Sequence, residues 1–224
     1  MRVVIRALAV PVWRTLPWRT LGAAGAVGLL IPGLPRLAGA EPAEWVTLLL
    51  LRTAALVLAL GLAFLLDDPA RHGTTPVPTG RAVRTALRVA LVAPFAAAWW
   101  TAVLLLAPGA HRPPAADVTL EAGAACALAL ALAGLAVRHS DDPHPSRPAA
   151  TILLAAALLA PLLLPDDWPL FVPAGDPRWD TAHDHWTWLL AASGAVWLAT
   201  LREPIRRPLR SPFRRRSPRP RRSG

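Results

Sequence analysis

The sequence predicts an all-helical, polytopic membrane protein with six transmembrane helices. Of its 224 residues, 54% are hydrophobic, and they gather into long blocks separated by short charged or proline-rich stretches, as in chains that cross a bilayer. Residues 46–51 and 53–66 are apolar on every helical face, so they require lipid or protein on all sides. Arginine and tryptophan concentrate near the ends of the blocks, where a membrane meets water.

Residues 1–19 are expected to lie flat in the membrane interface. Four arginines alternate there with apolar and aromatic side chains, which is typical of an amphipathic interfacial helix. The first span follows at about residues 20–35, and it is short and interrupted by Pro32. A cleaved signal peptide is the alternative, because Ala38, Gly39 and Ala40 resemble a small-residue cleavage site.

Five further spans are predicted downstream. The second begins just after Glu41 and Pro42, residue types that favour a helix start. The sixth is expected to begin near Pro177 with Asp176 as its N-cap, although only the part after Trp186 is strongly apolar. The bounds are about residues 44–66, 86–108, 118–137, 149–164 and 177–201.

The placement of arginine predicts that both termini face the cytoplasm of a bacterial cell membrane. Four arginines lie in the N-terminal segment, three between the second and third spans, two between the fourth and fifth, and ten after Leu201. The opposite side has only Arg36, Arg112 and Arg178. Short loops rich in arginine remain on the cytoplasmic side.

The ten tryptophans fit the same layout. Most fall at the expected inner or outer interface, where indole rings are enriched: Trp13, Trp18, Trp45, Trp168, Trp179, Trp186 and Trp188. Trp99, Trp100 and Trp197 lie within spans and are expected to pack against neighbouring helices.

The cytoplasmic ends of the second, fourth and sixth spans each carry acidic residues followed by proline. The acidic residues are Asp67, Asp68, Asp141, Asp142 and Glu203. One interpretation is a weak internal repeat of three outward-to-inward helices, as is common in transporters. The other is that an acidic residue before proline simply ends one helix and caps the next.

Residues 202–224 are expected to form a disordered cytoplasmic tail. Ten arginines and five prolines leave few apolar side chains, so the tail cannot bury enough surface to fold alone. Because it is tethered to a membrane helix, the expected partners are anionic lipids or a protein, and not nucleic acid.

Arg52 is the most informative single residue. It lies about 12 Å inside the second span, at a depth where a charge is costly. Glu121, near the start of the fourth span, is the carboxylate closest to the same depth and the expected counter-ion. Two alternatives stay open: Arg52 reaches the outer interface by itself, or it binds an anionic substrate.

A second polar group precedes and begins the sixth helix: Asp176, Asp180, His183, Asp184 and His185. An Asp and a His three residues apart can place two metal ligands on one helical face, but the spacing matches no zinc motif. Helix capping accounts for the acids, so no metal or cofactor is predicted.

Enzyme chemistry is not predicted either. The sequence has no nucleophile elbow and no dinucleotide glycine pattern. It contains no lysine, which excludes a Walker A lysine and a Schiff base. Its single cysteine, Cys126, excludes an internal disulfide and is expected to pack between helices.

The basic aromatic N-terminus, residues 63–70, and residues 175–179 followed by Ala182, His183 and Trp186 resemble small actinobacterial multi-pass proteins described as membrane components of ABC transport systems. The likeness spans most of residues 1–205 and carries over no site residues. It implies a permease subunit of the type-2 exporter kind, working as a homodimer or with a sister permease and driven by a separate ATPase. The short loops, which show no clear coupling helix, depart from that pattern. A non-transporting scaffold that recruits partners through the basic tail is the alternative.

Overall fold

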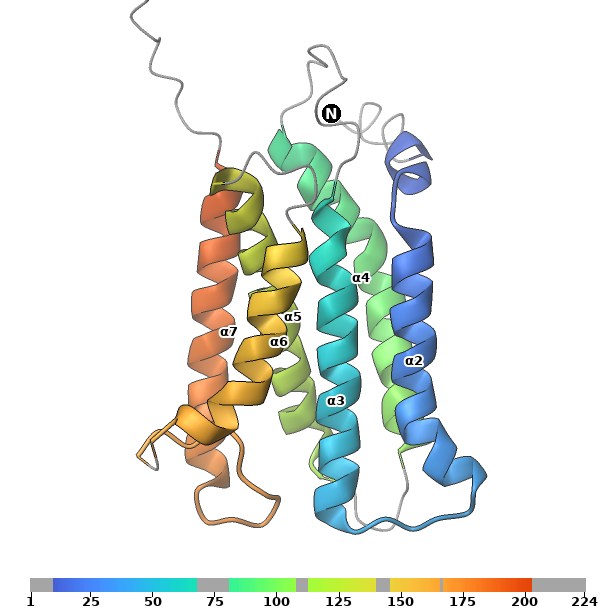
Figure 1. The fold of residues 1–224 in the computed structure, drawn as a ribbon, viewed down its shortest axis with the longest axis vertical. Coiled ribbons are helices and arrows are strands. Elements are labelled where there is room, and N and C mark those ends of the chain that lie inside the picture. The colour runs from blue at the N-terminus through green and yellow to red at the C-terminus, as the bar shows by residue number, and fades with distance from the viewer. Residues whose placement is uncertain (1–9, 68–80, 108–112, 140–145, 166, 203–224) are drawn as a thin grey trace, which may run out of the picture.

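The computed structural model describes residues 10–67, 81–107, 113–139, 146–165 and 167–202. All the regular structure in these ranges is helical, and the long helices run alternately in opposite directions (Figure 1). A short helical segment at residues 10–14 comes first, and the 3-10 turn η1 (Phe64–Leu66) extends α3. The long helices are α2 (Trp18–Leu37), α3 (Glu44–Ala63), α4 (Arg81–Leu106), α5 (Ala115–His139), α6 (Ser146–Leu163) and α7 (Trp179–Leu201).

Five of these helices are long and apolar enough to cross a membrane, which indicates a membrane-embedded protein. They are α2, α3 with η1, α4, α5 and α6. The helix α7 is also long, with 23 residues, but it does not join this group. Its first two turns carry Asp180, His183, Asp184 and His185, so only its second half resembles a span. The sixth expected span is therefore less apolar than the other five, because ionisable residues occupy its first half.

Three of the helices begin before the apolar blocks from which the spans were predicted. The helix α4 begins at Arg81, five residues before the expected start, and α5 and α6 also begin three residues early. Hydropathy marks where a helix meets lipid, whereas backbone hydrogen bonding continues into the polar flanks. The expected starts were therefore too late.

Pro32 does not interrupt the first span. It lies with Pro35 inside α2, a continuous helix of 20 residues. Pro32 and Gly33 are buried, and packing against neighbouring helices allows a helix to continue past a missing N–H group.

The start of α7 also corrects an expectation. Asp176 does not cap the helix and Pro177 is not in its first turn, because α7 begins at Trp179. The Oδ1 atom of Asp176 instead accepts a hydrogen bond of 2.8 Å from the backbone N–H of Arg178, which closes a tight turn before the helix.

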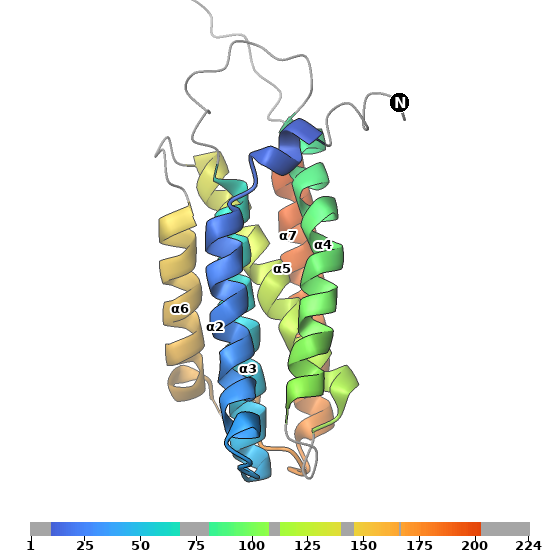
Figure 2. The same ribbon diagram turned by 90° about the vertical axis from the view of Figure 1, so that its right-hand side faces the viewer.

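The centre of the bundle is α5, which packs against α3, α6 and α7 (Figure 2). On the far side of α3, α2 packs against α3 and α4. Small side chains line the closest contacts, and the most deeply buried are Ala54, Ala59 and Ala63 on α3 and Ala124, Ala129 and Ala133 on α5. Cys126 lies among the apolar residues between α3 and α5. Small residues allow helix backbones to approach closely, as in other membrane bundles.

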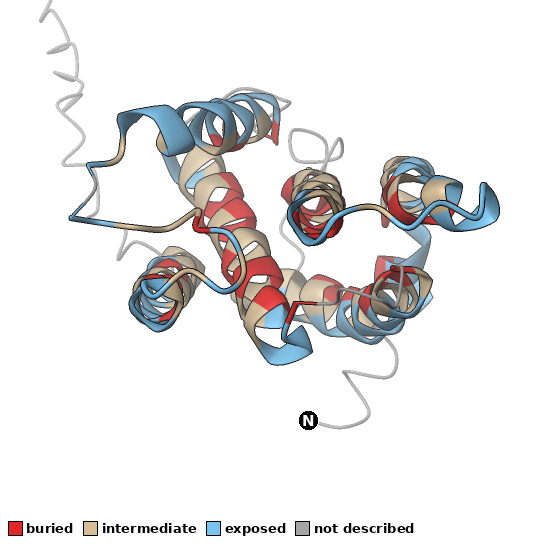
Figure 3. Ribbon diagram, turned by 90° about the horizontal axis from the view of Figure 1, so that it is seen from below, coloured by how far each residue is buried: buried red, intermediate tan, exposed pale blue. Residues whose placement is uncertain are grey.

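The peripheral helices have exposed outward faces (Figure 3), and many large apolar side chains are exposed on them. On α6 the exposed large side chains are Ile152, Leu154, Leu158, Leu159, Leu162 and Leu163. An exposed apolar surface of this extent is unusual in water and ordinary in lipid.

The three tryptophans expected to pack inside the bundle have different surroundings. The indole N–H of Trp99 donates to the carbonyl oxygen of Gly25 on α2 at 2.8 Å, and that of Trp100 donates to the Thr119 hydroxyl on α5 at 3.0 Å. The indole nitrogen of Trp197 is buried without a hydrogen-bond partner. In the middle of α4, Phe95 contacts the rings of Trp13 and Trp18, so the described part of the N-terminal segment folds onto this helix.

Candidate functional site

Three helices, α3, α5 and α7, begin at the same end of the bundle (Figure 1). Each carries an acidic residue in its first turn: Glu44, Asp117 and Asp180. The N-terminus of a helix is the positive end of its dipole, so carboxylates are favoured there.

Arg52 and Glu121 form a two-pronged ion pair between α3 and α5. The Nε and Nη2 atoms of Arg52 donate to the two carboxylate oxygens of Glu121, both at 2.7 Å. The side chain of Glu121 is 4% exposed and that of Arg52 is 18% exposed. Parallel hydrogen bonds of this kind are the strongest arrangement for an arginine and a carboxylate. The structure thus brings together the two residues that were expected to meet.

The remaining donors of Arg52 reach the segment between α6 and α7. Its Nη1 atom donates to the carbonyl oxygen of Val172 at 3.3 Å. Its guanidinium carbon also lies 5.6 Å from the centre of the Phe171 ring, a distance at which a cation is attracted to an aromatic face. Arg52 therefore does not reach out alone to the interface, as one alternative required.

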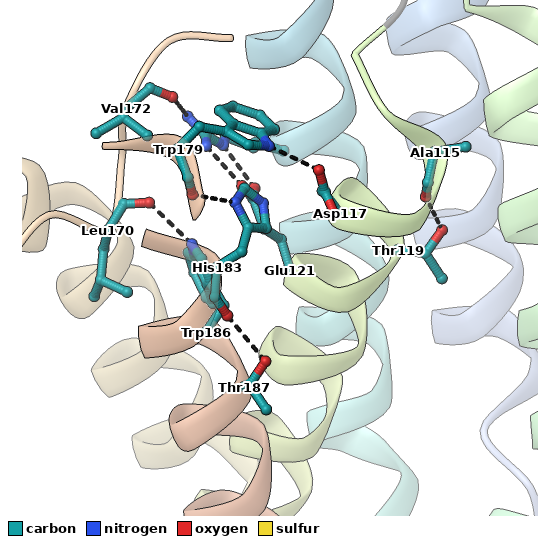
Figure 4. A network of polar contacts seen from close by, with 11 residues as sticks. Ala115, Asp117, Thr119, Glu121, Leu170, Val172, Trp179, His183, Trp186 and Thr187 are labelled. Carbon is teal, nitrogen blue, oxygen red and sulfur yellow. Dashed lines mark hydrogen bonds and ion pairs between the residues drawn. The ribbon is translucent and has the colours of Figure 1, made fainter. Parts of the chain in front are cut away.

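His183 of α7 completes what we call the ionic network, which consists of Arg52, Glu121 and His183 (Figure 4). The side chain of His183 is 9% exposed, and its Nε2 atom lies 3.3 Å from Oε1 of Glu121. This approach has the distance of an ion pair but not the geometry of a hydrogen bond, so Nε2 has no hydrogen-bond partner. The other ring nitrogen, Nδ1, lies 2.8 Å from the carbonyl oxygen of Trp179.

Asp117 connects to this network through an indole ring. The Nε1 atom of Trp179 donates to Oδ2 of Asp117 at 2.7 Å, and the Trp179 ring lies against the imidazole of His183 with 4.4 Å between ring centres (Figure 4). In its ionised form each of the Asp117 and Glu121 carboxylates carries one negative charge, and the guanidinium of Arg52 carries one positive charge. These three groups together therefore carry one net negative charge.

The segment before α7 is held in place through its backbone. His185 Nδ1 lies 3.0 Å from the carbonyl oxygen of Pro169, and Trp186 Nε1 donates to that of Leu170 at 2.9 Å. The Trp168 ring stacks on His185 with 4.0 Å between ring centres. Together with the bond from Arg52 to Val172, these contacts place the segment beside the ionic network.

The acidic and histidine residues around the start of α7 do not converge. His183 points into the bundle and His185 contacts Trp168, whereas Asp180 and Asp184 are exposed. Asp176 pairs with Arg178, and hydrogen bonds from the side chain and backbone of Arg178 lower the pKa of Asp176. No group of three or more potential metal ligands occurs among the described residues.

Of the acidic residues before prolines, only Asp67 is described, and Asp68, Asp141, Asp142 and Glu203 lie outside the described residues. Asp67 lies at the opposite end of the bundle from the ionic network. One of its carboxylate oxygens accepts from the backbone N–H of Ser146 at 3.1 Å and the other accepts from the Ser146 hydroxyl. Asp67 therefore caps the first residue of α6, in a contact between helices that are distant in sequence.

Sequence reasoning did not place His183 with Glu121. The signal that could have done so is helical spacing, because Trp179, His183 and Trp186 recur at intervals of four and three residues and share one face. A histidine between two large aromatic residues on the buried face of a helix needs a polar partner inside the bundle.

Comparison of the chain with models of known protein families, with curated proteins and with solved structures finds no match. The geometry of the site therefore carries the argument that follows.

Proposed function

We propose that the chain is a permease-like subunit of an ABC-type export system in a bacterial cell membrane, with both termini in the cytoplasm. The observation that carries the proposal is the ionic network. Arg52 and Glu121 lie about 12 Å and about 9 Å along α3 and α5 from the helix starts. Ionisable side chains at such depth are costly, and they commonly belong to substrate or ion pathways.

The surroundings of the network support a role in a pathway. Arg52 keeps 18% exposure and lies at the edge of the network, whereas Glu121 is 4% exposed and lies inside it. An anionic group that enters from this end would meet the guanidinium first. The aromatic rings of Phe171 and Trp179 flank the network and would exclude bulk water from it.

The energy source is proposed from composition and from the resemblance to ABC membrane components. The chain contains no lysine, so it cannot form a nucleotide-binding loop of the Walker A type. ATP hydrolysis then belongs to a separate ATPase, and the subunit works as a homodimer or with a sister permease.

Purification tests this proposal most directly. The full-length chain, extracted from its native membrane in mild detergent, is expected to co-purify with an ATPase. When both are reconstituted in lipid vesicles, the ATPase rate should depend on the presence of the chain. The double variant Arg52→Leu/Glu121→Leu should abolish this dependence, whereas Arg36→Leu, which removes an exposed arginine, should preserve it. Absence of any ATPase from the purified complex would contradict the proposal.

The second candidate is a non-transporting membrane scaffold, and the basic tail favours it. Ten arginines follow Leu201, and each basic residue near an anionic membrane contributes about 1 kcal/mol of attraction. Removal of residues 206–224 separates the candidates. A scaffold would lose its partner or its binding to anionic vesicles, whereas a permease would keep its ATPase.

A further inference from the structure

We infer that the ionic network binds one exchangeable proton between Nε2 of His183 and Oε1 of Glu121, which makes the protein responsive to pH at the end where α3, α5 and α7 begin. This inference is independent of the proposed function, because it concerns the occupancy of a site that a permease and a scaffold would share. Its basis is the hydrogen-bonding chemistry of the imidazole ring.

In the neutral His183 ring, the hydrogen is carried by Nδ1. Nδ1 of His183 lies 2.8 Å from the carbonyl oxygen of Trp179. A carbonyl oxygen can only accept, so Nδ1 must carry the hydrogen and donate it. In the neutral ring the other nitrogen, Nε2, is then an acceptor with a free lone pair.

The lone pair on Nε2 of His183 lies close to a carboxylate oxygen of Glu121. Nε2 is buried, has no hydrogen-bond partner, and lies 3.3 Å from a carboxylate oxygen of Glu121. Two acceptors at this distance in a dry environment repel each other, and each loses the hydrogen bonds that water would supply. One proton on Nε2 turns this contact into an attraction between an imidazolium and a carboxylate.

Charged groups from several elements surround this contact. From α3 the site faces Arg52, and from α5 it faces Glu121 and Asp117. On α7, Asp180 and Asp184 are exposed, and in the preceding segment Asp176 is paired with Arg178. The described parts of α4 and α6 carry no charged side chain at this end. Without the proton the network and Asp117 carry one net negative charge, and with it they are neutral.

The proton comes from water at the edge of the network, where the side chain of Arg52 is 18% exposed. It binds to Nε2, and Glu121 remains a carboxylate that accepts hydrogen bonds from both Arg52 and His183. Proton binding at Nε2 forms or breaks no other bond, so it needs no co-reactant.

Nuclear magnetic resonance of the full-length chain, labelled with ¹⁵N-histidine and held in lipid nanodiscs, tests the inference. The His183 signal is assigned by its loss in His183→Asn, a change that keeps a side-chain amide near the Trp179 carbonyl. As pH falls from about 8 to about 5, the Nε2 signal should change from unprotonated to protonated. Glu121→Gln should make proton binding about tenfold weaker, because it removes the facing charge. His139→Asn, an exposed position at the opposite end of α5, should leave the titration of His183 unchanged.

A second measurement does not depend on the folding of the Glu121 variant. A proton on Nε2 replaces a repulsive contact with an ion pair in the folded state, so it stabilises that state where the proton is bound, and the stabilisation is lost as rising pH removes the proton. The melting temperature of the unchanged chain, relative to that of His183→Asn, should therefore be higher at pH 5.5 than at pH 8. The His139→Asn variant should follow the unchanged chain. A His183 ring that stays in one protonation state throughout, or equal pH dependence with and without His183, would overturn the inference.

Discussion

A charged side chain inside a membrane helix is stable only with a partner, and Arg52 has several. Its three nitrogen atoms donate to the two oxygens of Glu121 and to the carbonyl oxygen of Val172, with the Phe171 ring nearby. Arginine cannot lose its proton in proteins, so its partners must supply all the compensation. The carboxyl and imidazole groups of Glu121 and His183, in contrast, are of kinds that can gain or lose a proton.

We expect Arg52 and Glu121 to be energetically coupled. Glu121→Leu alone should lower the free energy of unfolding by about 3–5 kcal/mol, because it leaves a buried guanidinium without its main counter-ion. The double variant Arg52→Leu/Glu121→Leu should be more stable than Glu121→Leu alone, since it leaves an apolar seam. Denaturation of the unchanged chain, the two single variants Arg52→Leu and Glu121→Leu, and the double variant in detergent measures the coupling energy.

Arg36→Leu serves as the control for this cycle. Arg36 is exposed and donates to the carbonyl oxygen of Leu105 at 3.3 Å, so its loss should change the free energy of unfolding by less than about 0.5 kcal/mol. If the effects of the Arg52 and Glu121 changes simply add, the pair is not coupled and the network is not a unit.

At this scale the sequence predicts the pair but not the triad. Arg52 and Glu121 lie at similar depth in their spans, and depth can be counted along a helix from its start. The approach of His183 depends on α7 packing against α5, and the rotation of one helix against another is a tertiary property. The expected grouping of His183 with Asp180 and Asp184 followed sequence proximity, whereas in the structure His183 is buried and the two aspartates are exposed.

At the scale of elements, the contact between α2 and α4 depends on glycine. The ring of Trp99 on α4 lies directly against Gly25 and Gly28 of α2. A Cβ atom at Gly28 would overlap the ring atoms Cζ2 and Cη2 of Trp99, whereas a Cβ atom at Gly22 would meet nothing within 4 Å. Gly22, Gly25 and Gly28 recur every three residues, a spacing that permits a close helix contact but does not indicate that an indole ring fills the space.

We therefore expect Gly28→Ala to destabilise the protein and Gly22→Ala to leave it unchanged or slightly more stable. The first change forces the indole ring to shift, at a cost of about 1–3 kcal/mol. The second removes backbone flexibility from the same helix without a clash. Thermal unfolding of the two variants, monitored by tryptophan fluorescence, measures the difference. Equal melting temperatures would show that the ring moves without cost.

Element boundaries could be predicted only in part. The apolar blocks locate α3 well, because polar residues flank it closely, whereas α4 begins five residues before its expected start at residue 86. Pro32 was expected to interrupt the first span, yet Pro32 and Pro35 lie inside α2. Pro94 and Pro161, which fall within the expected third and fifth spans, lie inside α4 and α6. In a bundle, packing and a lipid surround favour continuity of the helix over the single hydrogen bond that proline removes.

For the molecule as a whole, the alternation of helix directions places the loops at two ends, and the sequence predicts which end faces the cytoplasm. A reporter that is active only in the cytoplasm should be active when fused after Arg71, after Arg147 or at Gly224. It should be silent after Arg112 or Ala174, because arginine is scarce on that side. Activity at Arg112 would contradict the orientation, and equal activity at all five sites would contradict a membrane-spanning bundle.

The global architecture was the most predictable level. Long apolar blocks determine that the chain is helical and membrane-embedded, because a lipid environment leaves few other ways to satisfy the backbone. The order of packing, with α5 at the centre, could not be predicted, since all five apolar helices have similar surfaces. The basic tail from residue 203 onward lies outside the described residues, and its disorder stays a prediction.

The segment between α6 and α7 is gripped through oxygen atoms that every amino acid possesses. His185, Trp186 and Arg52 contact the carbonyl groups of Pro169, Leu170 and Val172. Natural selection on this segment would then act on its length and on the path of its backbone, and at the level of side chains mainly on Trp168 and Phe171, whose rings contact the same three residues. Homologous proteins would keep the number of residues between α6 and α7 even where the amino-acid sequences of this segment have diverged.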